Sequence, residues 1–225
     1  MSDAPKTGSS GQIPLPLAAT SSRDRDSLIS GASNELALNL LDQSARWHNG
    51  CGLIIGESAS GKSHMLEVFA RANEVIPLTP SQLYLSYAAP ALAVDDLDEI
   101  VGDERAQETL FHLLNRAMVG ALTVLLVSRS QPRGWESLLP DLKSRLAAAT
   151  SATIQAPDDL LLMPLFVKHF ADAQVEVKPA VIEFLVSRIE RSYVAVQRAV
   201  AVVNSLALAE RRPVTVPLVK QALEL

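Results

Sequence analysis

Residues 52–66 read Gly-Leu-Ile-Ile-Gly-Glu-Ser-Ala-Ser-Gly-Lys-Ser-His-Met-Leu, and this stretch decides the fold. An apolar run ends at Gly56, and the spacing from Gly56 to the Gly-Lys-Ser triplet at residues 61–63 is that of a P-loop between a strand and a helix. Its glycines let backbone N–H groups turn towards phosphate oxygens, and the following helix adds further donors. The alternative is a chance Gly/Ser-rich turn, but the flanking strand and helix patterns favour a site for a nucleoside phosphate.

Each residue type in this loop has an expected role. The Lys62 ammonium is expected to reach the terminal phosphates, and the Ser63 hydroxyl is expected to ligate Mg²⁺. The predicted nucleotide-binding residues of the stretch are Gly56, Ser58, Ala59, Ser60, Gly61, Lys62, Ser63 and His64.

Composition narrows the class of protein. The chain has 225 residues, of which 48% are hydrophobic, so it is long enough for one domain and a smaller second one. Its net charge of −5 argues against duplex DNA as the main ligand, so contact with DNA is expected to be indirect. The single cysteine, Cys51, excludes an internal disulfide. No apolar run has membrane-spanning length and the N-terminus lacks a signal-peptide core, so a cytoplasmic protein without membrane contact is expected.

Residues 1–26 are rich in Ser, Gly, Pro and charge and are predicted to be a flexible tail. An apolar hexamer, Gln-Ile-Pro-Leu-Pro-Leu at residues 12–17, lies inside it. Two prolines hold this hexamer extended and lower the cost of ordering it on a partner. A tail that folds back on its own domain, or that contains leucines by chance, is the alternative. The residues predicted to contact the partner are Gln12, Ile13, Leu15, Pro16 and Leu17.

Strand and helix patterns alternate over residues 27–157, which predicts a parallel α/β domain with ligands at the carboxyl ends of the strands. The predicted strands are the one before the P-loop and residues 75–78, 91–94, 122–127 and 152–155. The predicted helices are one reaching about residue 47 with Ser33 or Asn34 as its N-cap, then residues 63–72 and 104–118.

Two carboxylates, Asp95 and Asp96, follow the strand at residues 91–94. At a strand end beside a P-loop, such groups hold Mg²⁺ and align an attacking water. A solvated acidic turn is the alternative, because Asp98 and Glu99 follow directly.

Residues 158–225 are predicted to form a small all-helical second domain. Its helices are expected at residues 160–173, 179–190, 192–209 and 217–223, with only a short apolar stretch at 214–216 between the last two. Pro179 and Pro217 suit the first turns of their helices.

Taken together, these motifs resemble the AAA+ module of the bacterial replication initiator DnaA over roughly residues 28–225. The resemblance is carried by the P-loop with His64, the strand end Val94-Asp95-Asp96, the sequence Leu-Lys-Ser-Arg at residues 142–145 and the helical lid. We expect the module to lack the C-terminal helix-turn-helix domain and the N-terminal helicase-interaction domain of the initiator. The tail hexamer instead is similar to the Gln-x-x-Leu-x-Leu motif that docks on the replicative sliding clamp. In this combination the chain resembles the Hda family, called HdaA in alphaproteobacteria.

The resemblance implies an AAA+ P-loop protein with a three-layer parallel sheet and a lid, which binds ADP or ATP with Mg²⁺. It implies regulatory inactivation of DnaA, by stimulating hydrolysis of DnaA-bound ATP and so preventing over-initiation of replication. Arg145 matches the arginine finger that acts in trans, Asp95 the magnesium position and Asp96 the water-aligning position. The implied partners are the DnaA AAA+ domain and, through residues 12–17, the β sliding clamp of DNA polymerase III. A homodimer or larger oligomer is compatible with the sequence.

Two positions depart from the DnaA pattern. The sensor position after the fourth strand falls near Arg129, with Ser128 as the expected polar contact. The lid arginine aligns near Val194, and either Arg191 or Arg198 is expected to replace it at the nucleotide. These departures point to weak intrinsic ATP turnover, which leaves open whether the chain is itself an enzyme.

Two other functions compete with the regulator. An ATPase of the helicase-loader type would act through its own ATP cycle, but it has no use for a clamp hexamer. A small-molecule P-loop kinase would carry an arginine-rich lid inserted between strands, whereas the helical region of this chain comes last.

Overall fold

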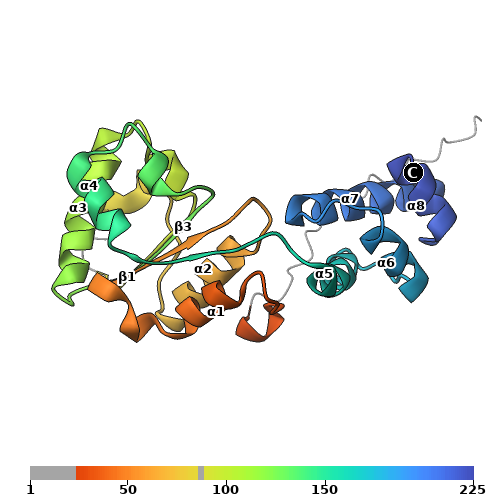
Figure 1. Cartoon of the computed structure of the whole chain (residues 1–225), viewed down its shortest axis with the longest axis horizontal. Helices are drawn as coiled ribbons and strands as arrows, with labels where there is room; N and C mark the ends of the chain where they lie inside the picture. The colour runs from red at the N-terminus through yellow and green to blue at the C-terminus, as the bar shows by residue number, and fades with distance from the viewer. Residues whose placement is uncertain (1–23, 86–88) are drawn as a thin grey trace, which may run out of the picture.

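The computed structural model describes residues 24–85 and 89–225, so the predicted clamp hexamer lies outside the described residues. The chain forms a parallel α/β part and a bundle of helices built from its last third (Figure 1). The strands are β1 (Cys51–Ile55), β2 (Ala91–Val94), β3 (Thr123–Ser128) and β4 (Thr150–Thr153). The helices are α1 (Glu35–Asp42), α2 (Lys62–Ala72), α3 (Glu104–Met118), α4 (Pro140–Ala147), α5 (Asp159–Asp172), α6 (Pro179–Val186), α7 (Tyr193–Glu210) and α8 (Val216–Leu223). Short 3₁₀ turns lie at Arg25–Ser27, Ser44–Arg46, His48–Gly50, Pro80–Leu85, Leu97–Ile100 and Pro132–Gly134.

The four strands are parallel in the order β2-β3-β1-β4, and helices cover both faces. Side chains of β1 alternate between the two layers, as expected for a buried strand. Leu53 and Ile55 pack with α3 and α4, while Ile54 packs with α1 and α2. The predicted three-layer α/β architecture is confirmed, and it brings the carboxyl ends of β1, β2 and β3 to one edge of the sheet.

The predicted strand at residues 75–78 is reduced to a single parallel bridge between Leu78 and Val94. Leu78 donates to the carbonyl of Ala93 at 2.9 Å, and its own carbonyl accepts from Asp95 at 2.8 Å. Pro77 precedes this bridge and has no N–H group, which prevents a longer ladder.

The first helix is shorter than predicted, because α1 ends at Asp42. The indole of Trp47 donates to the carbonyl of Leu40 at 2.8 Å, and the positive φ of Asn49 turns the chain into β1. Asn34 occupies the predicted N-cap position but does not cap α1 with its side chain. Its amide instead accepts from the Gly31 N–H at 2.9 Å and holds the preceding turn.

Helix α4 is not among the predicted elements. It begins at Pro140, whose fixed φ suits a first turn, and it buries Leu142 and Leu146 one turn apart in the core under α3. Only two large apolar residues, Leu142 and Leu146, mark this helix in the sequence, and the preceding loop contains Pro132 and Gly134.

The lid consists of α5, α6, α7 and α8, within a few residues of the predicted ranges except that α6 ends at Val186 rather than residue 190. Pro179 is the first residue of α6, as predicted. Val216 opens α8, so the apolar stretch at residues 214–216 is not a strand. Over the described ranges, no helix combines the length and the apolarity needed to cross a membrane.

Candidate nucleotide-binding site

The loop between β1 and α2 has the backbone that close approach to a phosphate requires. Gly56 donates to the carbonyl of Ser128 at 3.1 Å, and a Cβ added at Gly56 would lie 2.8 Å from the Ser60 hydroxyl. Gly61 is the N-cap of α2 with φ of 90°, and a Cβ added there meets no atom within 4 Å. The loop is therefore tight on its inner side and open at the helix N-terminus, where an anion is stabilised.

Lys62 lies inside the curl of this loop. The residue is 8% exposed, and its ammonium donates to the carbonyls of Gly56 at 2.7 Å and Glu57 at 2.6 Å. Burial lowers the pKa of Lys62, and the nearby charge of Arg129 adds to this effect. The loop thus holds a cation at the start of a helix, in the place where the sequence predicts the terminal phosphates.

The acidic turn, defined as residues 95–98, follows β2 at the same edge of the sheet. Asp95 accepts from the backbone N–H of Asp96 at 2.9 Å, and the Asp96 backbone has a positive φ of 45°. The Ser63 hydroxyl belongs to an exposed residue in the first turn of α2. A magnesium ion in such sites takes one or two protein ligands, with phosphate oxygens and waters completing its shell. Ser63 and Asp95 fit that pattern, and no group of three or more His, Cys, Asp or Glu forms a metal site among the described residues.

Arg129 holds the carboxylate of Asp96. Its guanidinium lies 2.8 Å from Asp96 Oδ1, and both side chains are partly exposed. The hydrogen bond that Arg129 donates to the Asp96 carboxylate is the main cause that raises the pKa of Arg129. Arg129, which directly follows β3, thus places a positive charge beside the acidic turn.

Asp98 fixes the turn that carries Arg129. Its carboxylate accepts from the backbone N–H groups of Arg129 at 2.7 Å and Ser130 at 3.2 Å, and from the hydroxyls of Ser128 at 3.1 Å and Ser130 at 2.9 Å. Burial raises the pKa of Asp98, but these hydrogen bonds outweigh it and leave the pKa below its ordinary value. Ser128 is the predicted polar contact at the nucleotide, and its hydroxyl donates to Asp98 and to the Ser130 carbonyl in this structure.

A cavity of about 180 Å³ opens beside the P-loop at Gly61. Three parts of the chain line it: the P-loop and α2, the segment before α1, and the lid. The lining residues are Ser27, Leu28, Ile29, Asn34, Ala59, Ser60, Gly61, His64, Met65, Leu165, Lys168, His169, Asp172 and Tyr193. Apolar and polar side chains both line this cavity, and its place next to the P-loop makes it the candidate site for the part of a nucleotide beyond the phosphates.

Tyr193, the first residue of α7, attaches the lid to the P-loop domain. Its hydroxyl lies 2.9 Å from the Ser33 hydroxyl, and its backbone N–H donates to Glu57 Oε1 at 2.9 Å. Lys168 of α5 adds a bond of 2.6 Å to the carbonyl of Ser27. These contacts join residues more than 130 positions apart, so local sequence patterns could not predict them.

His64, predicted at the nucleotide, lies on the P-loop side of this cavity. Its Nε2 is 3.0 Å from the Ser27 hydroxyl, which ties α2 to the segment before α1. On the opposite wall, burial lowers the pKa of His169. The structure therefore adds Lys168, His169 and Tyr193 to the predicted site.

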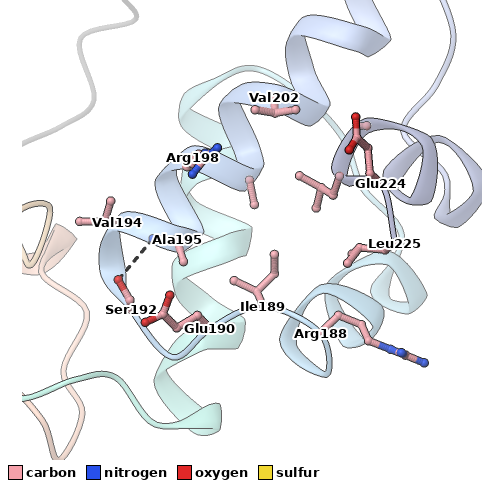
Figure 2. A pocket seen from close by; sticks show the side chains of 13 residues that line it. Arg188, Ile189, Glu190, Ser192, Val194, Ala195, Arg198, Val202, Glu224 and Leu225 are labelled. Atoms are coloured by element: carbon pink, nitrogen blue, oxygen red, sulfur yellow. Dashed lines mark hydrogen bonds between the residues drawn. The ribbon is translucent and has the colours of Figure 1, made fainter.

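The two lid arginines predicted at the nucleotide do not line the cavity beside Gly61. Arg191 precedes α7 rather than sharing its face, and it forms a two-bond ion pair with Asp159 at 2.8 Å. Arg198 lines a separate cavity of about 510 Å³ between α7 and the end of the chain (Figure 2). Tyr193 occupies the inward face of α7, and neither arginine lines the cavity beside Gly61.

Arg145 lies in the last turn of α4, half-buried beside the core-facing Leu142 and Leu146. Within residues 24–85 and 89–225, its guanidinium forms no ion pair or side-chain hydrogen bond. Neither the cavity beside Gly61 nor the acidic turn includes Arg145.

Comparison with known proteins identifies this arrangement. A model of the Hda lid domain matches residues 164–223. The AAA+ domain III of DnaA from Thermotoga maritima superimposes with a TM-score of 0.76 at 17% identity, covering 94% of this chain and 98% of that one. The chain is an Hda-like, DnaA-related protein. AMPPCP-bound DnaA from Aquifex aeolicus has the same fold, with a TM-score of 0.68 at 17% identity over 84% of this chain and 68% of that one.

The chain is also similar in sequence to two further proteins. An uncharacterised protein of Haemophilus influenzae is 27% identical over 191 residues, which cover 76% of this chain and 80% of that protein. DnaA of Cutibacterium acnes is 25% identical over 88% of this chain, but the chain spans only 45% of that initiator. The predicted AAA+ fold with a helical lid is confirmed for this Hda-like chain.

Proposed function

We propose that this Hda-like protein binds ADP or ATP with Mg²⁺ and, while tethered to the sliding clamp, stimulates hydrolysis of ATP bound to DnaA. Arg145 is the arginine finger that enters the nucleotide site of DnaA. DNA is contacted only indirectly, and replication is kept from starting too often.

A nucleotide fits this site. The P-loop is open at Gly61, Lys62 places a cation inside it, and a cavity with room for a base lies alongside. AMPPCP-bound DnaA from Aquifex aeolicus has the same fold, which supports nucleotide binding by this chain. Bound nucleotide with Mg²⁺ supplies negative charge and a metal at this loop, and Ser63 and Asp95 are the residues that would hold the metal.

One observation favours an activator over an ATPase with its own cycle: the contrast between Asp96 and Arg145. The Asp96 carboxylate, expected to align water in this chain's own site, is paired with Arg129 at 2.8 Å. The Arg145 guanidinium, expected to act on another molecule, is unpaired within the described ranges. A planar fork of N–H donors at developing triphosphate charge can supply about 10³–10⁵ in rate. A helicase-loader type of ATPase remains the competing function, and it requires a free Asp96.

Clamp tethering is proposed from the tail alone. Burial of Leu15 and Leu17 contributes about 3–6 kcal/mol before ordering costs. The double substitution Leu15→Ala with Leu17→Ala is expected to abolish retention on immobilised clamp and to leave calorimetric ADP binding unchanged.

Lys6→Ala, in the same tail but outside the hexamer, serves as the matched control and should bind the clamp normally. The functional test adds wild type and the double variant to DnaA–ATP on clamp-loaded DNA and follows hydrolysis. Wild type should stimulate and the double variant should not. Clamp binding that survives deletion of residues 1–20 would refute the tether.

A further inference from the structure

A row of hydrogen bonds runs from the acidic turn to the helix that carries Arg145. Asp98 Oδ1 accepts from the Ser130 hydroxyl at 2.9 Å, and the same hydroxyl accepts from the Trp135 indole N–H at 2.8 Å. The Trp135 carbonyl then accepts from Lys143 Nζ at 3.2 Å. Lys143 lies two residues before Arg145 on α4.

Trp135 is also anchored by packing. Its ring lies against the core formed by α3, α4 and one face of the sheet, and its backbone N–H donates to Pro132 at 3.1 Å. The indole N–H bond therefore fixes a side chain that packing already limits to few orientations. Because both the ring and the backbone of Trp135 are held, a change in the position of Ser130 would displace Trp135 and, through its carbonyl, Lys143.

The beginning of α4 has a separate anchor on α3. The buried Gln107 side chain accepts from the Leu139 N–H at 2.8 Å and donates to the Ser137 carbonyl at 3.1 Å. The end of α4, where Arg145 projects, is held by its two buried leucines and by the Lys143–Trp135 contact. Gln107 therefore holds the start of α4, and the contact with Trp135 orients the end of the helix that carries Arg145.

We propose that Trp135 is a positioning residue for Arg145. The proposal rests on the function given above, in which Arg145 acts on ATP bound to DnaA. A guanidinium that must meet phosphate oxygens with two N–H donors tolerates little displacement, because small misplacements of a reacting group are costly in rate. Trp135 contributes by orienting α4, while its own side chain contacts no nucleotide.

The test uses substitutions that keep shape and remove one hydrogen-bonding group. Trp135→Phe keeps an aromatic ring but loses the indole N–H, and Ser130→Ala removes its acceptor at a small, exposed residue. Trp47→Phe is the matched control, since that indole donates to the Leu40 carbonyl at 2.8 Å on the opposite side of the sheet. Each variant is added at increasing concentration to DnaA–ATP on clamp-loaded DNA, and the maximal rate and half-saturating concentration are measured.

We expect Trp135→Phe to lower the maximal stimulated rate by about two- to tenfold, the range for loss of one net hydrogen bond, with the half-saturating concentration unchanged. Ser130→Ala should lower it at least as much, and the double variant should fall no further than Ser130→Ala, because both act through one contact. Trp47→Phe should leave the maximal rate unchanged. ADP affinity should be the same in all four proteins.

Unchanged maximal rates in both Trp135→Phe and Ser130→Ala would overturn the proposal. So would a shift confined to the half-saturating concentration, which would make this loop part of the docking surface. Arg145→Ala, measured in parallel, distinguishes failure of the positioning role of Trp135 from failure of the proposed function of Arg145. An inactive Arg145→Ala with a normal Trp135→Phe refutes only the positioning role, whereas a normal Arg145→Ala refutes the proposed function itself.

Discussion

Removing the hydroxyl of Tyr193 should loosen the attachment of the lid to the P-loop domain. Tyr193 is 3% exposed, and its hydroxyl lies 2.9 Å from that of Ser33, which is also buried. Burial raises the pKa of Tyr193, in keeping with a phenol shielded from water. Tyr193→Phe keeps the ring in the core and leaves the Ser33 hydroxyl without this partner.

A buried hydroxyl left unpaired costs about 1–3 kcal/mol. With a urea m-value of about 3 kcal/mol per molar, the upper part of the range for small proteins, the midpoint of unfolding should fall by roughly 0.3–1 M. Urea unfolding followed by circular dichroism measures this shift. Because the same contact fixes one wall of the cavity beside Gly61, ADP affinity should also fall.

Two companion variants separate the hydrogen bond from other effects. Ser33→Ala combined with Tyr193→Phe should cost no more than Tyr193→Phe alone, since no unpaired hydroxyl remains. Tyr84→Phe removes a hydroxyl from a residue that is 57% exposed and should change stability by less than about 0.5 kcal/mol. If Tyr193→Phe unfolds at the same urea concentration as Tyr84→Phe, the Ser33–Tyr193 contact does not stabilise the lid and the reasoning is wrong.

Three further predictions concern the site and the core. Lys62→Ala removes a charge-assisted contact worth about 1.5–3 kcal/mol, so calorimetry should show at least a tenfold loss of ADP affinity; unchanged binding would refute the P-loop assignment. Burial lowers the pKa of His169 from its ordinary 6.5, so the stability it contributes is present above pH 6.5 and is lost as pH falls through the lower folded-state pKa. Wild type should therefore lose more stability than His169→Gln between about pH 7.5 and 5.5, and equal losses would contradict that direction. Burial raises the pKa of Cys51 to about 12, so its thiol should not react with a disulfide reagent until the protein is unfolded; rapid labelling of native protein would show that the thiol is accessible.

Local patterns were sufficient for the parts of the fold that depend on few distant contacts. The P-loop spacing from Gly56 to Ser63 predicted a strand, a tight loop and a helix, and α3 occupies the predicted residues 104–118. β2 likewise occupies residues 91–94, because a short apolar run followed by two aspartates marks its end clearly. Periodicity and turn chemistry within about 15 residues decide such elements.

Elements held by contacts distant in the sequence were harder to predict. Helix α4 has only Leu142 and Leu146 to mark its buried face, and its start is anchored by Gln107 of α3, more than 30 residues away. In the same way, Tyr193 reaches the P-loop from the third lid helix, which helical periodicity alone cannot reveal. Arg198 shows another limit of sequence patterns: its residue type suits a phosphate, but periodicity does not reveal that it lines the cavity between α7 and the end of the chain.

The catalytic role in trans has a direct test. Labelled ATP bound to DnaA is followed in a single turnover on clamp-loaded DNA, with wild type, Arg145→Ala, Arg145→Lys or Asp96→Asn added in turn. Arg145→Ala should bind ADP, the clamp and DnaA yet lose nearly all stimulation, and Lys should not restore it, because a point ammonium lacks the planar fork of donors. Asp96→Asn should stimulate normally, since Asp96 belongs to this protein's own site and is already paired with Arg129. Normal stimulation by Arg145→Ala together with failure of Asp96→Asn would contradict the account and assign the function to this protein's own ATPase cycle.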